Sequence, residues 1–424
     1  MRSLSEAITS RLGPAWQQPN FRLTWYASTI SFGGTLMTQL ALPLTAVAVL
    51  DATPAEMGLL TALQNVPRAG LILFGGIWAD RIRRQPFLVG GELLTAALVG
   101  SISVAAVFGS LRLTQLFIVA LLWGTIEAFT DPAWDAFYPT AVGREHLGDA
   151  NRILHATAGG LSVIAPATAG ALIQVFGAPY VMGVDAATYV VAAGIVAKLQ
   201  VAERPPERSA ERRLWGELVE GLRLLWSDRM LRMTTLVYTV WHFAGWGMVT
   251  TLWVLYLRRV LGLEPVWIGG LGAVGGVILM LAMWASPRLQ KRIGFGRLVV
   301  VATTSFVVSA FLIPLASGDR IVILSILMAA TATGWAGALV MNVSLQTLRQ
   351  TVTPDRILGR VSAGSDFIAA LFIAAGSLVA GVLAGRFGIR TTLWISAFLH
   401  PLMLVALARS SIPAMREIPT RSTT

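Results

Sequence analysis

Residues 57–108 read MGLLTALQNVPRAGLILFGGIWADRIRRQPFLVGGELLTAALVGSISVAAVF, and this stretch decides the fold. It contains two apolar runs, 57–79 and 87–108, and each is long enough to cross a bilayer as a helix, which takes roughly 20 residues. The segment between them carries one aspartate and three arginines, which are costly to place inside a membrane. The stretch therefore predicts two membrane-spanning helices joined by a short charged loop.

The composition of the whole chain extends this prediction. Of the 424 residues, 55% are apolar and only 13% are charged, whereas an ordinary soluble domain has about 25% charged residues. These values exclude a soluble globular enzyme and a disordered protein, and an outer-membrane barrel would be less apolar. We predict an all-α integral membrane protein of twelve transmembrane helices. The predicted spans are 25–50, 57–79, 87–108, 113–138, 153–176, 179–199, 232–257, 266–285, 298–317, 321–345, 361–385 and 391–409.

The basic residues fall mainly on one side of these spans. The two termini and the loops on their side hold 26 of the 33 basic residues, the opposite loops hold six, and Arg68 lies inside a span. By the positive-inside rule both termini are expected in the cytoplasm. The net charge of +11 then reflects orientation and contact with membrane lipids, and nucleic acid is not an expected partner. Cysteine is absent and the four histidines are scattered, so neither a metal site nor a cofactor is predicted.

Two halves of the chain match at a constant offset of 211 residues. Pro54 and Gly58 correspond to Pro265 and Gly269, and the pair Ala169-Gly170 corresponds to Ala380-Gly381. Such parallel repeats place a substrate site between the halves, near the middle of the membrane. The predicted organisation is an N-terminal six-helix half (1–199), a cytoplasmic linker (200–231), a C-terminal six-helix half (232–409) and a cytoplasmic tail (410–424). We expect the linker to form an amphipathic helix on the membrane surface and the tail to be disordered.

The loop after the first run, Gly76-Ile-Trp-Ala-Asp80-Arg81-Ile-Arg83-Arg84, resembles the G-x-x-x-D-R-x-G-R-R/K signature of the major facilitator superfamily, with Arg83 in place of the internal glycine. The twelve predicted spans and the repeat extend this likeness over nearly the whole chain. The resemblance implies a secondary transporter, not an enzyme. It also implies a multi-pass protein of the bacterial inner membrane that works by alternating access, and we expect a monomer.

Finer motifs are similar to those of the bacterial exporter branch that includes the enterobactin exporter and several multidrug pumps. The exporters' G-P-x-x-G-G signature appears as residues 165–170, in which Pro166 and Gly170 are kept and two glycines are replaced by alanine. The drug-antiporter signature centred on an arginine in the fourth span is absent. Small residues allow helices to approach closely. We expect such packing at Pro166, Gly170, Gly376 and Gly381.

The fourth span carries three carboxylates. Glu127, Asp131 and Asp135 are spaced four residues apart and therefore share one face of a helix, which must avoid lipid. Glu127 and Asp131 lie deeper, and they are candidates for proton coupling or cation binding; the alternative is a helix held by buried ion pairs. Asp135 lies near the cytoplasmic end, where we expect it to be a structural partner of Arg81 or Arg84.

Polar and aromatic stripes also mark the first, seventh and tenth spans. In facilitator proteins spans 1, 4, 7 and 10 line the central cavity, so the resemblance implies that these side chains do so here. The predicted cavity combines carboxylates on one side with aromatic, histidine and amide groups on the other, which suits an amphiphilic and cationic ligand. Ordinary packing of Trp246, a backbone-bonded hydroxyl at Thr35 and a structural role for His242 are the alternatives. The candidates are Ser31, Thr35, Gln39, His242, Trp246, Thr250, Asn342 and Gln346.

Several further charged residues are candidates for conformational roles. Arg68 needs an anionic partner, and Glu127, Asp131 and Asp366 are equally acceptable. His155 and Asp366 occupy equivalent positions of the repeat, where they could latch an inner gate or form a structural bond. We expect Glu92 to pair with Arg83 or Arg84.

The signature loop itself suggests a clamp. Asp80 can sit against the positive end of the eleventh span near Arg360, and Arg81 or Arg84 can reach Asp135.

No phosphate-binding loop of the type G-x-x-x-x-G-K-[ST] is present, so the energy must come from an ion gradient or from the substrate's own gradient. The leading hypothesis is a proton-coupled exporter of amphiphilic small molecules, such as drugs or natural products. An importer or facilitator and a lysophospholipid flippase of the same fold are the alternatives.

Overall fold

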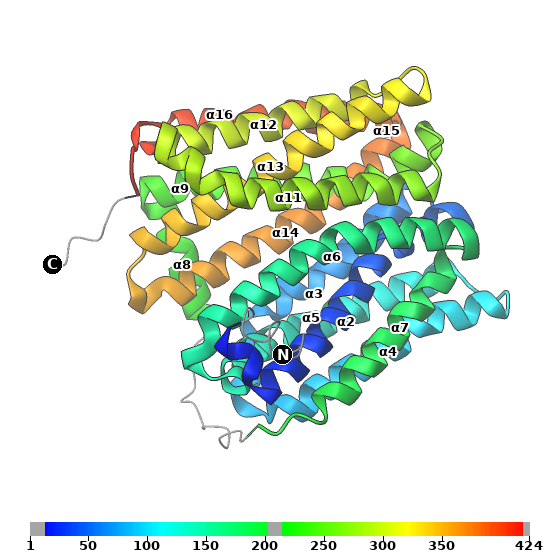
Figure 1. Cartoon of the computed structure of the whole chain (residues 1–424). Coiled ribbons are helices and arrows are strands. Elements are labelled where there is room, and N and C mark those ends of the chain that lie inside the picture. The colour runs from blue at the N-terminus through cyan, green and yellow to red at the C-terminus, as the bar shows by residue number, and fades with distance from the viewer. Residues whose placement is uncertain (1–12, 202–213, 419–424) are drawn as a thin grey trace, which may run out of the picture.

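The computed structural model describes residues 13–201 and 214–418, with the side chains of 72–81, 214, 215, 217, 218, 355 and 356 left undescribed. This part of the chain is helical, and its helices lie side by side along one common direction (Figure 1). The N-terminal group consists of α2 (Pro19–Leu44), α3 (Pro54–Arg81), α4 (Arg84–Val107), α5 (Leu113–Val142), α6 (Leu147–Phe176) and α7 (Ala178–Val196).

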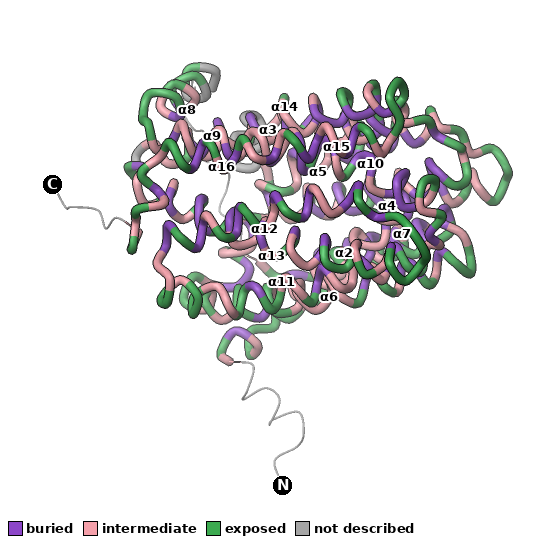
Figure 2. Tube along the Cα trace, turned by 90° about the horizontal axis from the view of Figure 1, so that it is seen from above, coloured by how far each residue is buried: buried purple, intermediate pink, exposed green. Residues whose placement is uncertain are grey.

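The second group follows the linker helix α8 (Leu214–Ser227). The first and last described residues and α8 lie at one end of the helices, which we call the linker face; the other end is the opposite face (Figures 1 and 2). The two groups meet mainly through the pairs α3–α14 and α6–α11. The C-terminal group consists of α9 (Arg229–Val240), α10 (Thr250–Leu255), α11 (Pro265–Ile293), α12 (Phe295–Leu315), α13 (Arg320–Val352), α14 (Asp355–Phe387), α15 (Ile389–Leu399) and α16 (Pro401–Ala408).

Among the described residues, ten helices are long and apolar enough to cross a membrane. Their outer surfaces carry exposed large apolar side chains such as Val107, Val175 and Ile321, which are 67–78% exposed and fit a lipid environment. Each predicted span overlaps a helical segment. Two of the predicted spans, 57–79 and 232–257, do not correspond to any of these ten helices. The first lies in α3, and the second lies in the stretch 229–260, in which α9 and α10 are joined by the π-helix η4 (Trp241–Val249).

The 211-residue repeat reappears in the backbone. The π-helical turns η2 (Thr45–Val49) and η5 (Tyr256–Val260) are separated by this offset and end the first helix of each group. Matching hydrogen bonds close both turns: Leu50 N donates to Thr45 O at 3.2 Å, and Leu261 N donates to Tyr256 O at 3.1 Å. The two groups therefore share an unusual local geometry that helix propensity alone does not specify.

Four glycines of the repeat form close contacts between the groups. Gly58 of α3 lies against Gly381 of α14, and Gly170 of α6 lies against Gly269 of α11, so that a Cβ on any of them would meet backbone atoms of the other helix. The two contacts are related by the 211-residue offset. Small residues are needed here because the helix backbones touch.

Two other expected packing positions also lie in close contacts. A Cβ at Gly269 would collide with the carbonyl of Pro166, and one at Gly376 would collide with the carbonyl of Phe243.

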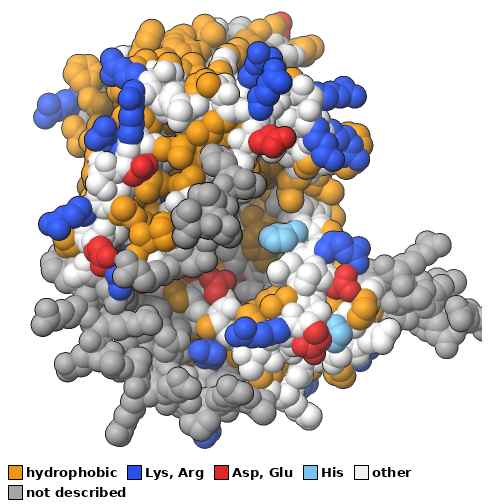
Figure 3. Space-filling model, turned by 90° about the vertical axis from the view of Figure 1, so that its left-hand side faces the viewer, with side chains coloured by type: hydrophobic (Ala, Val, Ile, Leu, Met, Phe, Trp, Pro, Cys, Tyr) orange, Lys and Arg blue, Asp and Glu red, His pale blue; other side chains and the backbone are white. Residues whose placement is uncertain are grey.

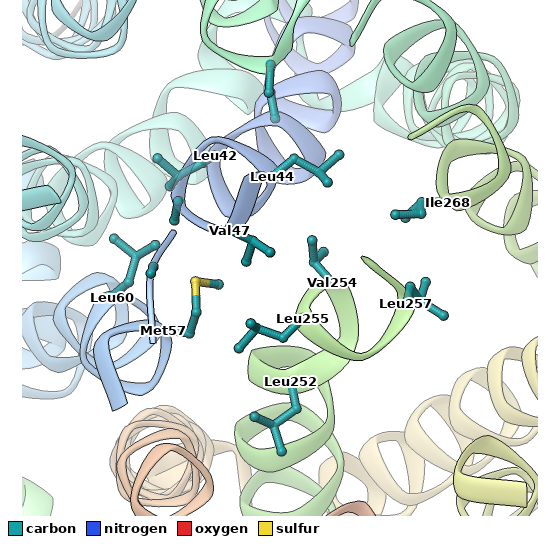
Figure 4. Packing of buried hydrophobic residues seen from close by; sticks show 14 of the residues in the cluster. Leu42, Leu44, Val47, Met57, Leu60, Leu252, Val254, Leu255, Leu257 and Ile268 are labelled. Atoms are coloured by element: carbon teal, nitrogen blue, oxygen red, sulfur yellow. The ribbon is translucent and has the colours of Figure 1, made fainter. Parts of the chain in front are cut away.

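Apolar side chains of both groups fill the molecule near the opposite face. Leu44 and Val47 of the first group approach Val254 and Leu255 of the second, and Met57 lies beside them (Figure 4). We call Leu44, Val47, Met57, Val254 and Leu255 the apolar plug; each is at most 5% exposed. Outside the plug, Arg259 forms an ion pair with Asp51 across the two groups, at 2.5 Å. The opposite face is therefore closed in this structure.

The described residues revise two expectations about polar segments. Helix α8 does not simply lie on the membrane surface: Leu225 is fully buried against Val361 and Ile368 of α14, because the apolar stripe of α8 finds a protein surface to cover. The tail is ordered up to residue 418, with Ile412 buried. Its carbonyls accept the free N–H groups at the start of α12, from Phe295 at 2.9 Å and Gly296 at 2.8 Å, which explains why it is held.

Candidate functional site

A cavity of about 550 Å³ lies among the N-terminal helices. Helices α2, α4, α5, α6 and α7 form its wall, and the residues of α5 in it run from Trp123 toward the linker face at Tyr138. Figure 3 views the linker face, which is hollowed near its centre, with acidic side chains and a histidine near the hollow. The residues that line the cavity include four carboxylates and no lysine, arginine or histidine. The cavity is therefore suited to a positively charged or proton-carrying occupant.

The carboxylate stripe of α5 lies in this wall. Glu127, Asp131 and Asp135 all line the cavity, as their four-residue spacing on one helical face requires. Arg68 of α3 pairs with Asp131, with 3.2 Å between Nη2 and Oδ2, so the structure selects one of the three partners that the sequence left open. Both side chains are about half exposed, 51% and 48%. Glu127 is the deeper acid, and Trp123 lies beside it in the same wall.

Glu92 of α4 is a cavity residue whose predicted role is wrong. The sequence predicted a pair with Arg83 or Arg84, but Glu92 lines the cavity and is only 9% exposed. The Ser31 hydroxyl donates to its Oε2 at 3.3 Å, and Trp134 lines the same cavity close by. An isolated acid inside an otherwise apolar span was the available signal, since such residues usually face a functional interior.

Hydroxyl groups of α2 connect the cavity to α7. Thr35 bonds both the backbone of Ser31 and the Tyr189 hydroxyl, at 2.7 Å from the latter. One turn later, Thr38 donates to the buried carboxylate of Asp185. Gly34 lies beside Asp185 and leaves room for its carboxylate. Ser31, Thr35 and Gln39 thus share one wall of the cavity. Thr35 both lines the cavity and bonds the backbone, so the cavity role and the backbone-bonded alternative are both supported.

The candidates of the C-terminal helices do not line this cavity. His242 Nδ1 lies 2.7 Å from the Tyr238 carbonyl oxygen, and the Tyr238 hydroxyl donates to Asn342 at 2.8 Å. Thr250 donates to the carbonyl of Trp246, whose side chain is 48% exposed, and Gln346 is exposed. The structure therefore divides the predicted site: the acid-rich part lines one cavity, and the histidine–amide part forms a separate cluster.

The gate candidates are only partly described. The side chains of Asp80 and Arg81 lie outside the described residues, and Arg84 donates to the Ala136 carbonyl at 3.3 Å, one residue beyond Asp135. Arg360 pairs at 2.6 Å with Glu220 of α8, a partner that the sequence did not indicate.

The predicted latch is not closed in this structure. Within the described part of the chain, no hydrogen bond or ion pair joins His155 to Asp366. Both side chains are exposed, and the charges near Asp366 are Arg349 and Arg68.

Comparison with known proteins gives one family and several relatives. Residues 9–424 match the family described as transmembrane secretion effector. The chain is 25% identical to the multidrug efflux pump Tap of Mycolicibacterium fortuitum over 84% of its own length and 87% of that protein. It is 22% identical to macrolide efflux protein A of Streptococcus pyogenes, covering 94% and 98%, and 24% identical to the enterobactin exporter EntS of Citrobacter koseri, covering 81% and 80%.

Solved structures give the same fold at low identity. A point mutant of the nucleoside transporter NupG superposes with a TM-score of 0.74 at 12% identity, covering 92% of this chain and 98% of that one. A bacterial homologue of the human lysosomal transporter Spinster, in an inward-facing and unoccupied conformation, gives a TM-score of 0.71 at 13% identity, covering 96% and 100%.

Proposed function

Because the chain belongs to the major facilitator superfamily, in its transmembrane secretion effector family, we propose that this transporter is a proton-coupled exporter of amphiphilic, cationic small molecules. Its relatives named above are drug, macrolide and enterobactin efflux proteins, which favours export. The acidic cavity carries the proposal about the substrate.

The chemistry of the cavity wall supports a cationic substrate. Glu92, Glu127, Asp131 and Asp135 provide negative charge, and no basic residue lines the wall. Trp134 lies on the same wall and is partly exposed, so it offers an aromatic side chain to a cation and to apolar groups. A cavity of about 550 Å³ lies within the size range of drug-sized ligand sites.

The proposed architecture is a pair of six-helix halves with twelve spans and both termini in the cytoplasm, within the inner membrane. The offset-related π-turns and glycine contacts support two equivalent halves. In this arrangement the linker face is cytoplasmic and the present state is inward-facing, because the apolar plug closes the opposite face. Rocking of the two halves against each other would then expose this cavity of the N-terminal half to either side.

We further propose that Glu127 and Asp131 exchange protons for substrate. A cationic substrate and a proton compete for the same carboxylates, so binding of one releases the other. A proton gradient directed inward then drives export without nucleotide hydrolysis.

The test measures accumulation of lipophilic cations and neutral amphiphiles in an efflux-deficient bacterium. We expect the intact protein to lower cation accumulation, and both a protonophore and the Glu127→Gln/Asp131→Asn double variant to abolish the effect. Glu145→Gln, a change at a carboxylate that is 74% exposed and lies outside the cavity wall, is the matched control and should pump normally. Normal cation export by the double variant would refute proton exchange at these acids, and raised accumulation would indicate an importer.

A further inference from the structure

Arg68 joins the cavity to the contact between the two helix groups. It follows Pro67 on α3, the N-terminal helix that packs along α14. Its guanidinium forms an ion pair with Asp131 on the cavity wall. Because α3 packs along α14, Arg68 is also within electrostatic range of Asp366 on α14, and Arg349 of α13 is a second positive charge near Asp366.

Four residues of alternating charge lead from the N-terminal to the C-terminal group of helices. The order is Asp131 on α5, Arg68 on α3, Asp366 on α14 and Arg349 on α13. Within the part of the chain that the structure describes, Arg68 has Asp131 as its ion-pair partner, whereas no ion pair is formed by Asp366. Asp366 is exposed in this state, so it can accept a cation when the linker face closes.

The Arg68–Asp131 ion pair is weak enough for Arg68 to change its partner. An ion pair whose two side chains are half exposed is weakly held, because water screens it. A proton or a substrate cation that binds Asp131 neutralises its negative charge and so removes the electrostatic attraction that holds Arg68 beside it. The free guanidinium then has two carboxylates nearby that form no ion pair within the described part of the chain, Glu127 and Asp366. Of these two, Asp366 is the one that lies across the gap between the groups.

We propose that Arg68 is a tethered counter-ion that moves from Asp131 to Asp366 when the cavity acid is neutralised, and thereby links cavity occupancy to closure of the linker face. Arg68 is a positioning residue in this scheme and need not contact the substrate. The scheme rests on the proposed function only for the identity of the occupant, since loss of the Asp131 charge is the trigger in every case.

The absence of cysteine allows a direct test in the full-length protein. Asn151 is exposed and lines the cavity at the start of α6, so Asn151→Cys reports whether the linker face is open. The experiment measures the rate at which N-ethylmaleimide alkylates Asn151→Cys in detergent without substrate. Asp131→Asn should slow alkylation at least threefold because Arg68 is released to Asp366. The slowing should vanish in the Asp131→Asn/Asp366→Asn and Asp131→Asn/Arg68→Gln combinations.

Two further variants complete the design. Asp366→Asn alone should label at least as fast as the parent, which tests the scheme even if Asp131→Asn fails to fold. Glu145→Gln is the surface control and should leave the rate unchanged. The proposal would be overturned if Asp131→Asn slowed alkylation equally whether Asp366 is intact or changed to Asn. It would also be overturned if Asp366→Asn alone slowed alkylation. Because no substrate is added, failure of cation export in the accumulation assay would leave this result interpretable.

Discussion

Glu92 illustrates how much one side chain depends on its neighbours. By sequence it follows a cluster of arginines by about two to three helical turns, which favoured an ion pair. In the structure Glu92 lies on the inward face of α4, where the Ser31 hydroxyl donates a hydrogen bond to its carboxylate in the cavity wall. The site thus has a fourth acid, on a different helix from the other three. Its position on a second wall makes it suited to select for substrate charge.

We therefore expect Glu92→Gln to discriminate between classes of substrate. A hydrogen bond to a charged group contributes about 1.5–3 kcal/mol, so affinity for a lipophilic cation should fall roughly tenfold or more, whereas affinity for a neutral amphiphile should hardly change. The measurement is ligand binding to purified protein by tryptophan fluorescence. Ser31→Ala, which keeps the carboxylate, is the control and should have a smaller effect. Equal losses for cationic and neutral ligands would contradict a charge-selective role.

At the scale of elements, two pairs of helices carry the contact between the groups. The α3–α14 and α6–α11 crossings are made at glycines that repeat with the 211-residue offset. The identities were visible in the sequence, but which glycine meets which could not be read from it. Gly58 contacts Gly381 and not its repeat partner Gly269, because the two groups are arranged around an axis and present unlike helices to each other.

Neighbouring glycines of α11 provide a matched test of this contact. Gly269→Leu should be destabilising by about 1–3 kcal/mol, because its side chain would collide with the backbone of α6. Gly270→Leu should be neutral or stabilising, since open space surrounds Gly270. Thermal unfolding of the purified proteins in detergent measures both. Similar losses for the two variants would show that general helix effects, and not the crossing, dominate.

At the scale of the whole molecule, the conformation depends on which end of the helices is closed by packed side chains. The opposite face is closed by two unlike devices, the apolar plug and the Asp51–Arg259 pair. The Asp51 side chain is 95% exposed, so the pair should contribute no more than about 1 kcal/mol. The plug residue Leu255 is fully buried, and truncating such a side chain typically removes about 2–5 kcal/mol. The plug should therefore dominate closure.

This difference can be measured at a single reporter. Val47→Cys places a thiol of similar size inside the plug, where Val47 is 4% exposed. We expect Leu255→Ala to raise its rate of alkylation by at least tenfold and Asp51→Asn to raise it less than fivefold. The parent Val47→Cys protein should react slowly. A larger effect from Asp51→Asn than from Leu255→Ala would mean that the ion pair, and not apolar packing, closes this face.

The sequence by itself determined the class of molecule, the position of most helices and the superfamily. These follow from local properties: apolar runs of membrane length, a charged loop signature and a repeat offset that survives in loops and helices. It also identified the carboxylate stripe of α5, because a spacing of four residues fixes one helical face whatever the surroundings.

Only the tertiary structure decided what lies opposite each of these faces. It selected Asp131 as the ion-pair partner of Arg68 and Glu220 of α8 as that of Arg360. It also placed Glu92 in the cavity wall and the histidine–amide cluster outside the acidic cavity. It also ordered residues 410–418 of the tail, which were expected from the sequence to be disordered. These outcomes depend on contacts between residues up to 140 positions apart. Helical periodicity specifies the direction of a side chain relative to its own axis, whereas a partner depends on how the helices are arranged.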